Sequence, residues 1–467
     1  MKIVVIGGGP GGYAAAFYAA DLGMDVTLVD MEKNPGGVCL YRGCIPSKAL
    51  LHVAKLIQET KEAKHWGISF GEPEIDLDKL RAFKNKVVSK LTGGLGILTK
   101  QRKINFVQGR ASFVSSTSID VKKENGETTS ISFDKAIIAT GSVIASIPGL
   151  QIDSNRLLNS TSALDLPAIP KSLLVVGGGY IGLELGSVYA ALGSKVSVVE
   201  FMDRILPGAD QDLVVHLQKK LEKSFESIML KSRVTGIQEV EEGLKVNIEN
   251  SAGQTESIIY DYVLMSIGRK PQTAGLGLEN TGVKVNERGW IITGKDMQTT
   301  DARIFAIGDI AGEPMLAHKA SHEARVAVDV ISGKKAAFEP LAIPAVVFTD
   351  PEIAWAGITE NQAKEKQMNY KAVSFPWAAS GRAVTLDRND GVTKLIVDPD
   401  TERILGAGIC GPGAGELIAE AVLAIEMGAT VSDLALTIHP HPTLSETMME
   451  AAELFFGHSS HLYKPKH

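Results

Sequence analysis

Two stretches of the chain share one succession of apolar and glycine-rich positions. Residues 2–30 (KIVVIGGGPGGYAAAFYAADLGMDVTLVD) and residues 172–200 (SLLVVGGGYIGLELGSVYAALGSKVSVVE) each contain an apolar run, a glycine turn, an apolar helical stretch and a second apolar run that ends in an acid. Short apolar runs bounded by turn signals are typical of buried strands, so each stretch predicts a strand–helix–strand unit.

The glycines of the two stretches fall at the same offsets, and so do the terminal acids. In a dinucleotide-binding unit the first glycine permits a tight turn, the second lets the backbone approach a pyrophosphate, and the third lets helix and strand pack closely. The helix N-terminus supplies N–H groups to the phosphates, and the acid accepts hydrogen bonds from a ribose. The predicted dinucleotide sites comprise Gly7, Gly9, Gly12 and Asp30, and Gly177, Gly179, Gly182 and Glu200.

The rest of the chain completes this pattern with further strands. Three short apolar runs, at 136–142, 263–271 and 304–309, resemble strands that finish nucleotide-binding sheets. After about residue 340, strands followed by helices suggest a separate α+β unit. We expect an α/β protein with two Rossmann-like dinucleotide-binding domains and a C-terminal α+β domain. The expected bounds are 1–147 and 271–340 for the first domain, 148–270 for the second and 341–467 for the C-terminal domain.

Composition narrows the possible partners and location. The formal net charge of -6 leaves no excess of basic residues for a nucleic acid backbone, so we expect no nucleic acid partner. No apolar run approaches the roughly 18 to 20 residues that span a bilayer, so we expect no membrane association. A strand pattern that begins at residue 2 leaves no room for a leader, which predicts a cytoplasmic protein.

Cys39 and Cys44 lie close together in a chain with only three cysteines. Such a pair in a reducing compartment is more often catalytic, redox-active or metal-binding than structural. Zinc would need two further soft ligands, which the sequence does not place nearby, so we expect no metal. Packing of two buried thiols is the other alternative. The segment CLYRGCIPSKALL predicts the start of a helix, where a thiolate is favoured, and this supports a redox-active pair.

The segment GGVCLYRGCIPSKALL resembles the redox-active disulfide segment of the flavin-dependent disulfide reductases, the class I pyridine nucleotide-disulfide oxidoreductases. Its CIPSK motif is more similar to the dihydrolipoamide dehydrogenases of that family than to glutathione reductases. The resemblance covers essentially the whole chain and implies FAD in the first domain, NAD in the second and a C-terminal dimerisation domain of a homodimer. Further segments occur in the family's order: GGGYIGLELGSVYAALGSKVSVVE, DRILPGAD, SIGRKPQT, IFAIGD, LAHKASHEA, FTDPEIAWAG, GPGAGELIAEA and HPHPTLSE.

The resemblance also implies catalytic roles for individual residues. Cys39 matches the interchange thiol that reacts with the substrate sulfur, and Cys44 matches the thiol stacked against the flavin. Lys48 matches the lysine near flavin N5, with Glu184 as its carboxylate partner. The third cysteine, Cys410, has no matched role and is expected to be a small core residue.

His441 matches the family's general base, and Glu446 matches the carboxylate that orients it. A base is needed because a thiol is a poor nucleophile and its thiolate is a good one. A carboxylate on the far ring nitrogen fixes the tautomer and stabilises the imidazolium. The neighbouring His439 is expected to be structural. In this family the base comes from the other subunit, so the resemblance implies an active site that only a homodimer completes.

Two residues bear on the choice of nicotinamide. Glu200 should accept the ribose hydroxyls of NAD and repel the extra phosphate of NADP, although Arg204 nearby could be taken as a phosphate ligand. Tyr180 is expected to gate the nicotinamide pocket, with simple packing as the alternative. The full sets that the resemblance implies are Gly7, Gly9, Gly12, Asp30, Lys48, Ala111, Gly141, Asp309 and Ala317 for FAD, and Gly177, Gly179, Tyr180, Gly182, Glu200, Val234 and Gly268 for NAD.

The implied reaction is oxidation of a dihydrolipoyl group through the two thiols and FAD, with hydride passed to NAD. The implied partners are the lipoyl domains of 2-oxo acid dehydrogenase complexes or the lipoyl carrier of glycine cleavage. One alternative is a related reductase that uses NADPH with glutathione or mercuric ion; Glu200 opposes NADPH, and the terminal HSSHLYKPKH lacks the cysteine pair expected for mercuric reduction. Another alternative is a non-catalytic redox-sensing flavoprotein, which would have no need of the base.

Overall fold

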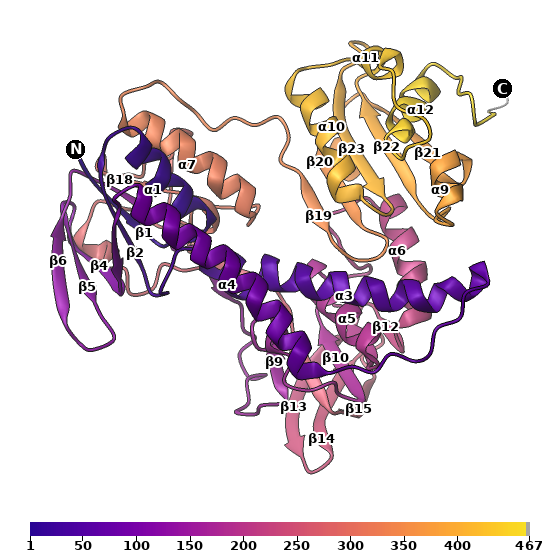
Figure 1. Cartoon of the computed structure of the whole chain (residues 1–467), viewed down its shortest axis with the longest axis horizontal. Coiled ribbons are helices and arrows are strands. Elements are labelled where there is room, and N and C mark those ends of the chain that lie inside the picture. The colour runs from indigo at the N-terminus through magenta and orange to yellow at the C-terminus, as the bar shows by residue number, and fades with distance from the viewer. Residues whose placement is uncertain (464–467) are drawn as a thin grey trace.

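A computed structural model describes residues 1–463 of the chain (Figure 1). The first dinucleotide unit is built on a five-stranded sheet in the order β18-β7-β1-β2-β3, and every pairing in it is parallel. The strands are β1 (Lys2–Ile6), β2 (Asp25–Asp30), β3 (Asn105–Gln108), β7 (Lys135–Ile138) and β18 (Ile304–Ala306).

Both faces of this sheet are covered, which explains why β1 is apolar at nearly every position. Ile3 and Val5 pack on α1 (Pro10–Asp21) and α7 (Ala317–Ile331), which lie against each other. Val4 and Ile6 face a three-stranded antiparallel sheet. Continuous apolar runs are the expected pattern of parallel strands buried on two sides. The antiparallel sheet consists of β4 (Arg110–Ser115), β5 (Ser118–Lys122) and β6 (Thr128–Ser132).

The second dinucleotide unit repeats this architecture. Its parallel sheet has the order β12-β11-β10-β16-β9, with α5 (Tyr180–Leu192) on one face and the antiparallel sheet β13-β14-β15 on the other. The parallel strands are β9 (Leu157–Asn159), β10 (Ser172–Val176), β11 (Lys195–Val199), β12 (Ser227–Met229) and β16 (Tyr262–Met265). The antiparallel strands are β13 (Arg233–Val240), β14 (Gly243–Glu249) and β15 (Thr255–Tyr260).

Between β2 and β3 the chain forms α2 (Gly37–Arg42), α3 (Cys44–Glu62) and the long α4 (Leu77–Gln101). Although α3 belongs to the first unit in sequence, Figure 1 shows it beside α5 of the second. Leu50 and Ala54 of α3 share one hydrophobic core with Leu183 and Leu185 of α5. This packing places the N-terminus of α3, with Cys44, where the two dinucleotide units meet.

The chain crosses between the two units on a pair of short strands. The outgoing β8 (Ser142–Ile144) and the returning β17 (Arg269–Pro271) pair antiparallel, with Ser142 opposite Pro271. The strands of the two parallel sheets lie inside the ranges expected for their domains, and the exact domain bounds stay a prediction.

The C-terminal unit has a five-stranded antiparallel sheet in the order β19-β20-β23-β22-β21, covered by helices (Figure 1). Cys410, at the end of β23, is fully buried, as expected of a core residue. The predicted fold class, two Rossmann-like domains and an α+β domain, is confirmed. The elements are β19 (Ala345–Val347), β20 (Ile353–Gly357), β21 (Lys371–Pro376), β22 (Val392–Val397) and β23 (Ile404–Cys410), with α8 (Glu360–Glu365), α9 (Gly381–Thr385), α10 (Ala414–Glu426), α11 (Val431–Leu436) and α12 (Glu446–Phe455).

Within residues 1–463 the structure contains no helix that combines the length and the apolar character needed to cross a membrane.

Candidate active site

The glycine turn of the first unit leaves no room for side chains. Gly7 has a φ of 102°, and a Cβ on it would lie 2.4 Å from the carbonyl oxygen of Ala139. A Cβ on Gly12 would lie 1.7 Å from the carbonyl oxygen of Gly7, so α1 packs directly on the turn. Gly9 precedes α1 without a side-chain cap, which leaves the first N–H groups of the helix for an anion.

The second unit repeats these contacts. A Cβ on Gly177 would lie 2.6 Å from the carbonyl oxygen of Ser266, and one on Gly182 would lie 2.3 Å from the oxygen of Gly177. A Cβ on Gly179 would meet nothing within 4 Å. The space beside this glycine is therefore open, as the approach of a pyrophosphate requires.

The two terminal acids hold their glycine turns in the same way. Asp30 accepts hydrogen bonds from the N–H groups of Gly8 (2.5 Å) and Glu32 (2.8 Å). Glu200 accepts the equivalent bonds from Gly178 (2.6 Å) and Met202 (2.7 Å). Each carboxylate offers about four acceptor sites, so both acids keep capacity for ribose hydroxyls. The shorter Asp30 thus reproduces the geometry of the longer Glu200.

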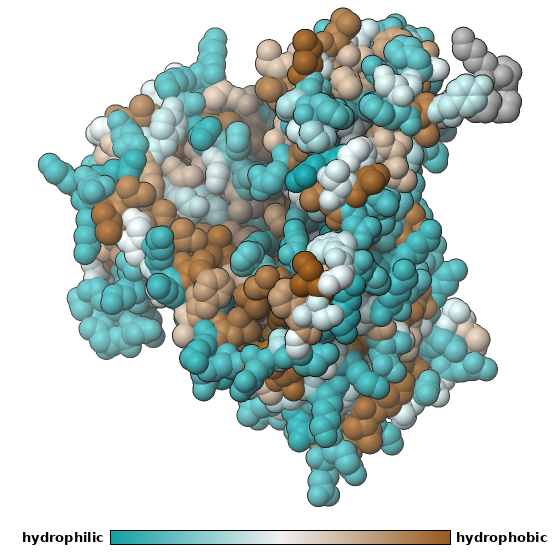
Figure 2. Space-filling model, turned by 45° about the vertical axis from the view of Figure 1, so that its right-hand side comes forward, coloured by the Kyte–Doolittle hydropathy of each residue, from teal (hydrophilic) through white to brown (hydrophobic). Residues whose placement is uncertain are grey.

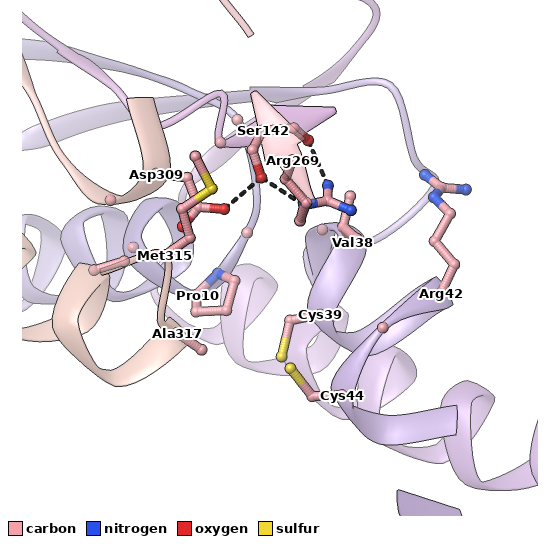
Figure 3. A pocket seen from close by; sticks show the side chains of 18 of the residues that line it. Pro10, Val38, Cys39, Arg42, Cys44, Ser142, Arg269, Asp309, Met315 and Ala317 are labelled. Carbon is pink, nitrogen blue, oxygen red and sulfur yellow. Dashed lines mark hydrogen bonds between the residues drawn. The ribbon is translucent and has the colours of Figure 1, made fainter. Parts of the chain in front are cut away.

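A cavity of about 280 Å³ opens beside the first glycine turn (Figure 3). Residues from both dinucleotide units line it, because α3 carries the thiol segment to α5. The structure therefore brings together residues that the sequence places far apart. The predicted site residues in its lining are Gly7, Gly9, Asp30, Cys39, Cys44, Lys48, Gly141, Tyr180, Glu184, Asp309 and Ala317.

These linings fit a flavin dinucleotide. The uncapped N-terminus of α1 offers N–H groups to a pyrophosphate, and Asp30 offers acceptors to a ribose. A Cβ on Gly37 would lie 2.5 Å from the Cα of Gly9, so glycine is required where α2 approaches the turn. The same cavity reaches the two thiols and Lys48.

The two thiols face each other across a break between helices. Cys39 lies in α2, Cys44 is the first residue of α3, and Gly43 between them interrupts the helix. Figure 3 shows the two sulfur atoms pointing toward one another. Both cysteines are free thiols in this structure. A Cβ on Gly43 would lie 2.9 Å from the carbonyl oxygen of Val38, so the tight break favours glycine.

The surroundings of the pair shift the pKa values of the two thiols in opposite directions. A hydrogen bond from the Cys39 thiol, together with the Lys48 ammonium, lowers the pKa of Cys44 to about 7. The hydrogen bond to Cys44 and burial raise the pKa of Cys39. In the reduced pair the thiolate therefore sits on Cys44, at the N-terminus of α3, and the proton sits on Cys39.

Lys48 is held by a buried carboxylate on α5. Its Nζ lies 2.7 Å from Glu184 Oε2, and Ser47 Oγ donates to the same oxygen at 3.0 Å. The other oxygen of Glu184 accepts the N–H of Phe348 at 3.0 Å, and Lys48 lies 4.4 Å from the centroid of the Phe348 ring. Glu184 therefore joins both dinucleotide units and the C-terminal unit while it positions the Lys48 charge near the thiols.

The two candidate histidines have opposite surroundings. The Nδ1 of His441 lies 2.8 Å from Glu446 Oε1, and its side chain is 68% exposed. The side chain of His439 is only 5% exposed, with one ring nitrogen 2.9 Å from Thr437 O and the other 2.7 Å from Glu420. Only His441 thus offers a ring nitrogen to a substrate. Although burial opposes it, the Thr443 N–H and the His441 ring lower the pKa of Glu446.

Not every predicted residue lines the cavity. His441 and Glu446 do not, so a single chain does not bring this pair to the thiols. Ala111 lies on β4 and is buried in the core of the first unit, and Val234 packs against the core of the second unit. The roles of these residues stay predictions. The others outside the cavity lining are Gly12, Gly177, Gly179, Gly182, Glu200 and Gly268.

Sequence reasoning missed several polar residues of the lining, among them Ser142 and Arg269. Ser142 and Arg269 lie a few residues after strands of the two parallel sheets, in the segments AIIATGS and SIGRKPQT, and each begins a crossover strand. The available signal was a polar side chain shortly after a strand of a nucleotide-binding sheet, since ligands bind at the carboxyl ends of such strands.

Comparisons with known proteins agree with this geometry. Dihydrolipoyl dehydrogenases of Vibrio cholerae and Haemophilus influenzae are each 49% identical to the chain and match 98% of it, with 96% and 95% of those proteins covered. The crystal structure of LpdA from Mycobacterium tuberculosis superposes with a TM-score of 0.90 at 28% identity, covering 97% of this chain and 99% of that one.

Two family models account for nearly the whole chain. The model of the pyridine nucleotide-disulphide oxidoreductases matches residues 1–324, and the model of their dimerisation domain matches residues 343–452. The first match spans both glycine turns and the thiol pair, and the second spans the His441–Glu446 pair. The resemblance seen in the sequence is therefore confirmed, and the chain belongs to the pyridine nucleotide-disulphide oxidoreductase family.

Proposed function

We propose that the chain is a dihydrolipoyl dehydrogenase, which oxidises a dihydrolipoyl dithiol and reduces NAD. The observation that carries this proposal is the Cys39–Cys44 pair in the cavity, with Lys48 and Glu184 beside it. Near-complete matches to dihydrolipoyl dehydrogenases at 49% identity support the choice of substrate within the family.

The cavity of the first unit would hold FAD, which when bound would supply the route for two electrons from the thiol pair to the nicotinamide. The N–H groups at the start of α1 would hold its phosphates, and the Asp30 carboxylate would hold its ribose. Lys48 places a positive charge beside the thiols, where Glu184 fixes it. Asp309, Gly141 and Ala317 complete the lining.

The chain's residues divide the sulfur chemistry between them. His441 takes the proton of one substrate thiol, and the resulting thiolate attacks Cys39 of the disulfide form, so that Cys44 leaves as a thiolate. The second substrate thiol then attacks the substrate sulfur that is bonded to Cys39. This step releases the substrate as a cyclic disulfide and returns Cys39 to the thiol. Two electrons then reside on the pair, with the thiolate on Cys44, where Cys39 and Lys48 stabilise it.

The chain carries a dimerisation domain. We take the functional unit to be a homodimer in which His441 and Glu446 reach the cavity of the partner. The exposure of His441 and its absence from the chain's own cavity support this arrangement. Figure 2 shows apolar surface in a hollow of the molecule and at the edge of the C-terminal unit. Exposed apolar side chains on α10 and around α11 are Leu423, Met427, Leu436 and Ile438.

The second unit would bind NAD, and Glu200 would hold its adenosine ribose. The carboxylate is buried and held by two backbone N–H groups, so it cannot turn away from the extra phosphate of NADP. Arg204, half-buried, is the residue that would oppose this choice. Tyr180 lines the flavin cavity from the first turn of α5, which supports a gate between the two cofactors. Lipoyl domains as partners and a cytoplasmic location stay predictions.

One assay tests the proposal against its alternatives. The purified chain should reduce NAD with dihydrolipoamide and should show little reduction of glutathione disulfide with NADPH. Cys44→Ser is the control for the thiol route, because it removes one sulfur and leaves the fold of α3. Activity with NADPH and glutathione disulfide alone would assign the chain to the related reductases. Bound FAD without either activity would favour a redox sensor.

A further inference from the structure

Three residues from separate segments form a hydrogen-bonded relay at the edge of the flavin cavity (Figure 3). Ser142 Oγ donates to Asp309 Oδ2 at 2.5 Å and accepts from Arg269 Nε at 2.7 Å. Arg269 Nη2 also donates to the carbonyl oxygen of Ser142 at 2.6 Å. The Arg269 guanidinium thus donates two hydrogen bonds to Ser142, and the Ser142 hydroxyl donates one to the Asp309 carboxylate.

The polarity of this relay has only one solution. A hydroxyl group has a single hydrogen, and arginine can only donate. Ser142 must therefore accept from Arg269 and give its own hydrogen to Asp309. A hydroxyl polarised by a cation is a stronger donor, and a hydrogen bond to a carboxylate is stronger than one between neutral groups. Ser142 is also buried, at 6% exposure, so water competes poorly for these bonds.

The relay leaves half of the Asp309 carboxylate available. Oδ2 is taken by Ser142, whereas Oδ1 accepts no hydrogen bond from a side chain or N–H group within residues 1–463. Asp309 lines the same cavity as the glycine turn and the thiols. A carboxylate whose one oxygen is clamped presents the other in a fixed direction, ready to accept from a hydroxyl group of a ligand.

The relay also bridges the crossing between the two dinucleotide units. Ser142 begins β8, the outgoing strand, and Arg269 begins β17, the returning strand, while Asp309 follows the last strand of the first unit. The side-chain bonds therefore connect the crossover to the floor of the flavin cavity.

We propose that Ser142 and Arg269 are positioning residues that aim the Asp309 carboxylate at a hydroxyl of the bound flavin cofactor. The inference rests on the proposed binding of FAD in this cavity. It assigns to the crossover strands a role in cofactor retention beyond the joining of two units.

The test measures FAD affinity in a double-mutant cycle of Ser142→Ala, Arg269→Gln and the double variant. Each protein is stripped of flavin and titrated with FAD, with flavin fluorescence as the readout. We expect Ser142→Ala to weaken binding about tenfold, because a charge-assisted bond that orients Asp309 is lost. Arg269→Gln should have a similar effect. The double variant should be no weaker than the weaker single variant, because both residues act through one carboxylate.

Ser154→Ala is the matched control. Ser154 Oγ also donates to a carboxylate, Glu239 Oε1 at 3.0 Å, but this bond is exposed and Ser154 does not line the cavity. Hydrogen exchange of residues 142–145 and 268–272 gives a readout without flavin: the apo form of Ser142→Ala should exchange faster there, and that of Ser154→Ala should not.

Three outcomes separate the possibilities. Equal FAD affinity for Ser142→Ala and Ser154→Ala would overturn the relay, and so would multiplicative effects in the double variant. If Ser142→Ala exchanges hydrogen faster at the crossover strands but binds FAD with unchanged affinity, the three residues only hold the strands together. That result would also overturn the proposal. If the parent chain binds FAD but does not oxidise dihydrolipoamide, the proposed function fails while the relay stands.

Discussion

The two dinucleotide units share a glycine turn and differ in the connection that leaves their second strand. After β2, residues 31–104 form α2, α3 and α4, whereas β11 reaches β12 through the single helix α6 (Gln211–Ser224). The thiols and Lys48 all lie in the first of these connections. The comparison shows that the glycine turn, common to both units, is suited to bind a pyrophosphate. The reactive side chains come instead from the segment that follows the second strand of the first unit.

The longer connection also changes how the units relate to each other. Because α3 packs on α5, residues of the second unit, Tyr180 and Glu184, line the cavity of the first. At the turn of the second unit, the space beside Gly179 is open. The cavity beside the first glycine turn is thus a joint product of both units.

The largest expected effect comes from removing the thiol pair from the first unit. Cys44→Ser should lower the rate of dihydrolipoamide oxidation about a thousandfold or more, because the leaving thiolate is lost. The affinity for NAD, measured by calorimetry, should stay unchanged because the second unit is intact. Cys410→Ala is the control, since this thiol is fully buried and does not line the cavity. Retention of a tenth of the parent rate would contradict the disulfide route.

Loss of the base should come next. His441→Gln is expected to slow dihydrolipoamide oxidation about a hundred- to a thousandfold, the usual contribution of a general base. His439→Gln is the matched control: it should lower the melting temperature, because both ring nitrogens are bonded, and spare the rate per folded chain. If His439→Gln proved the slower enzyme, the roles of the two histidines would be reversed.

The two glycine turns can be broken separately. Gly12→Ala forces a Cβ to 1.7 Å from an oxygen of the turn, and the purified protein should lose FAD. Gly182→Ala creates the same clash at 2.3 Å in the second unit, and should keep FAD while the KM for NAD rises about tenfold or more. Absorbance of bound flavin and steady-state kinetics distinguish these results. Loss of FAD in both variants would mean that the two units do not fold independently.

The smallest effect concerns the acidity of Cys44. The rate at which iodoacetamide alkylates the reduced apo-protein should increase as the pH passes about 7. The reactive thiolate of Cys44 forms above its pKa, which lies at that value. Lys48→Met removes a charge that lowers this pKa, so the midpoint should move upward by roughly one pH unit. Peptide mass analysis identifies the modified cysteine. A midpoint unchanged in Lys48→Met would mean that Lys48 does not set the acidity of Cys44.

Much of the fold could be predicted because its signals are local. Each glycine turn, its helix and its acid lie within one short stretch, and their contacts, such as Gly12 on Gly7 or Asp30 on the Gly8 N–H, join residues close in the chain. Backbone sterics alone impose glycine there. The thiol pair was visible for the same reason, since α2, Gly43 and α3 are consecutive.

The rest of the site joins residues that are distant in sequence. Residue patterns alone do not show that α3 leaves its own unit and packs on α5, because its apolar face fits any apolar surface. The relay of Ser142, Arg269 and Asp309 depends on three strand ends meeting at one edge.

The sequence by itself determined two dinucleotide units, a reactive thiol pair and the acids at the strand ends, because these depend on short-range geometry and on chemistry that few residue types can supply. Only the tertiary structure decided that Glu184 and Tyr180 enter the flavin cavity, that Ser142 clamps Asp309, and that His441 is exposed away from the thiols of its own chain. Those outcomes depend on how packed helices and paired strands set directions in space, which spacing along the chain does not specify.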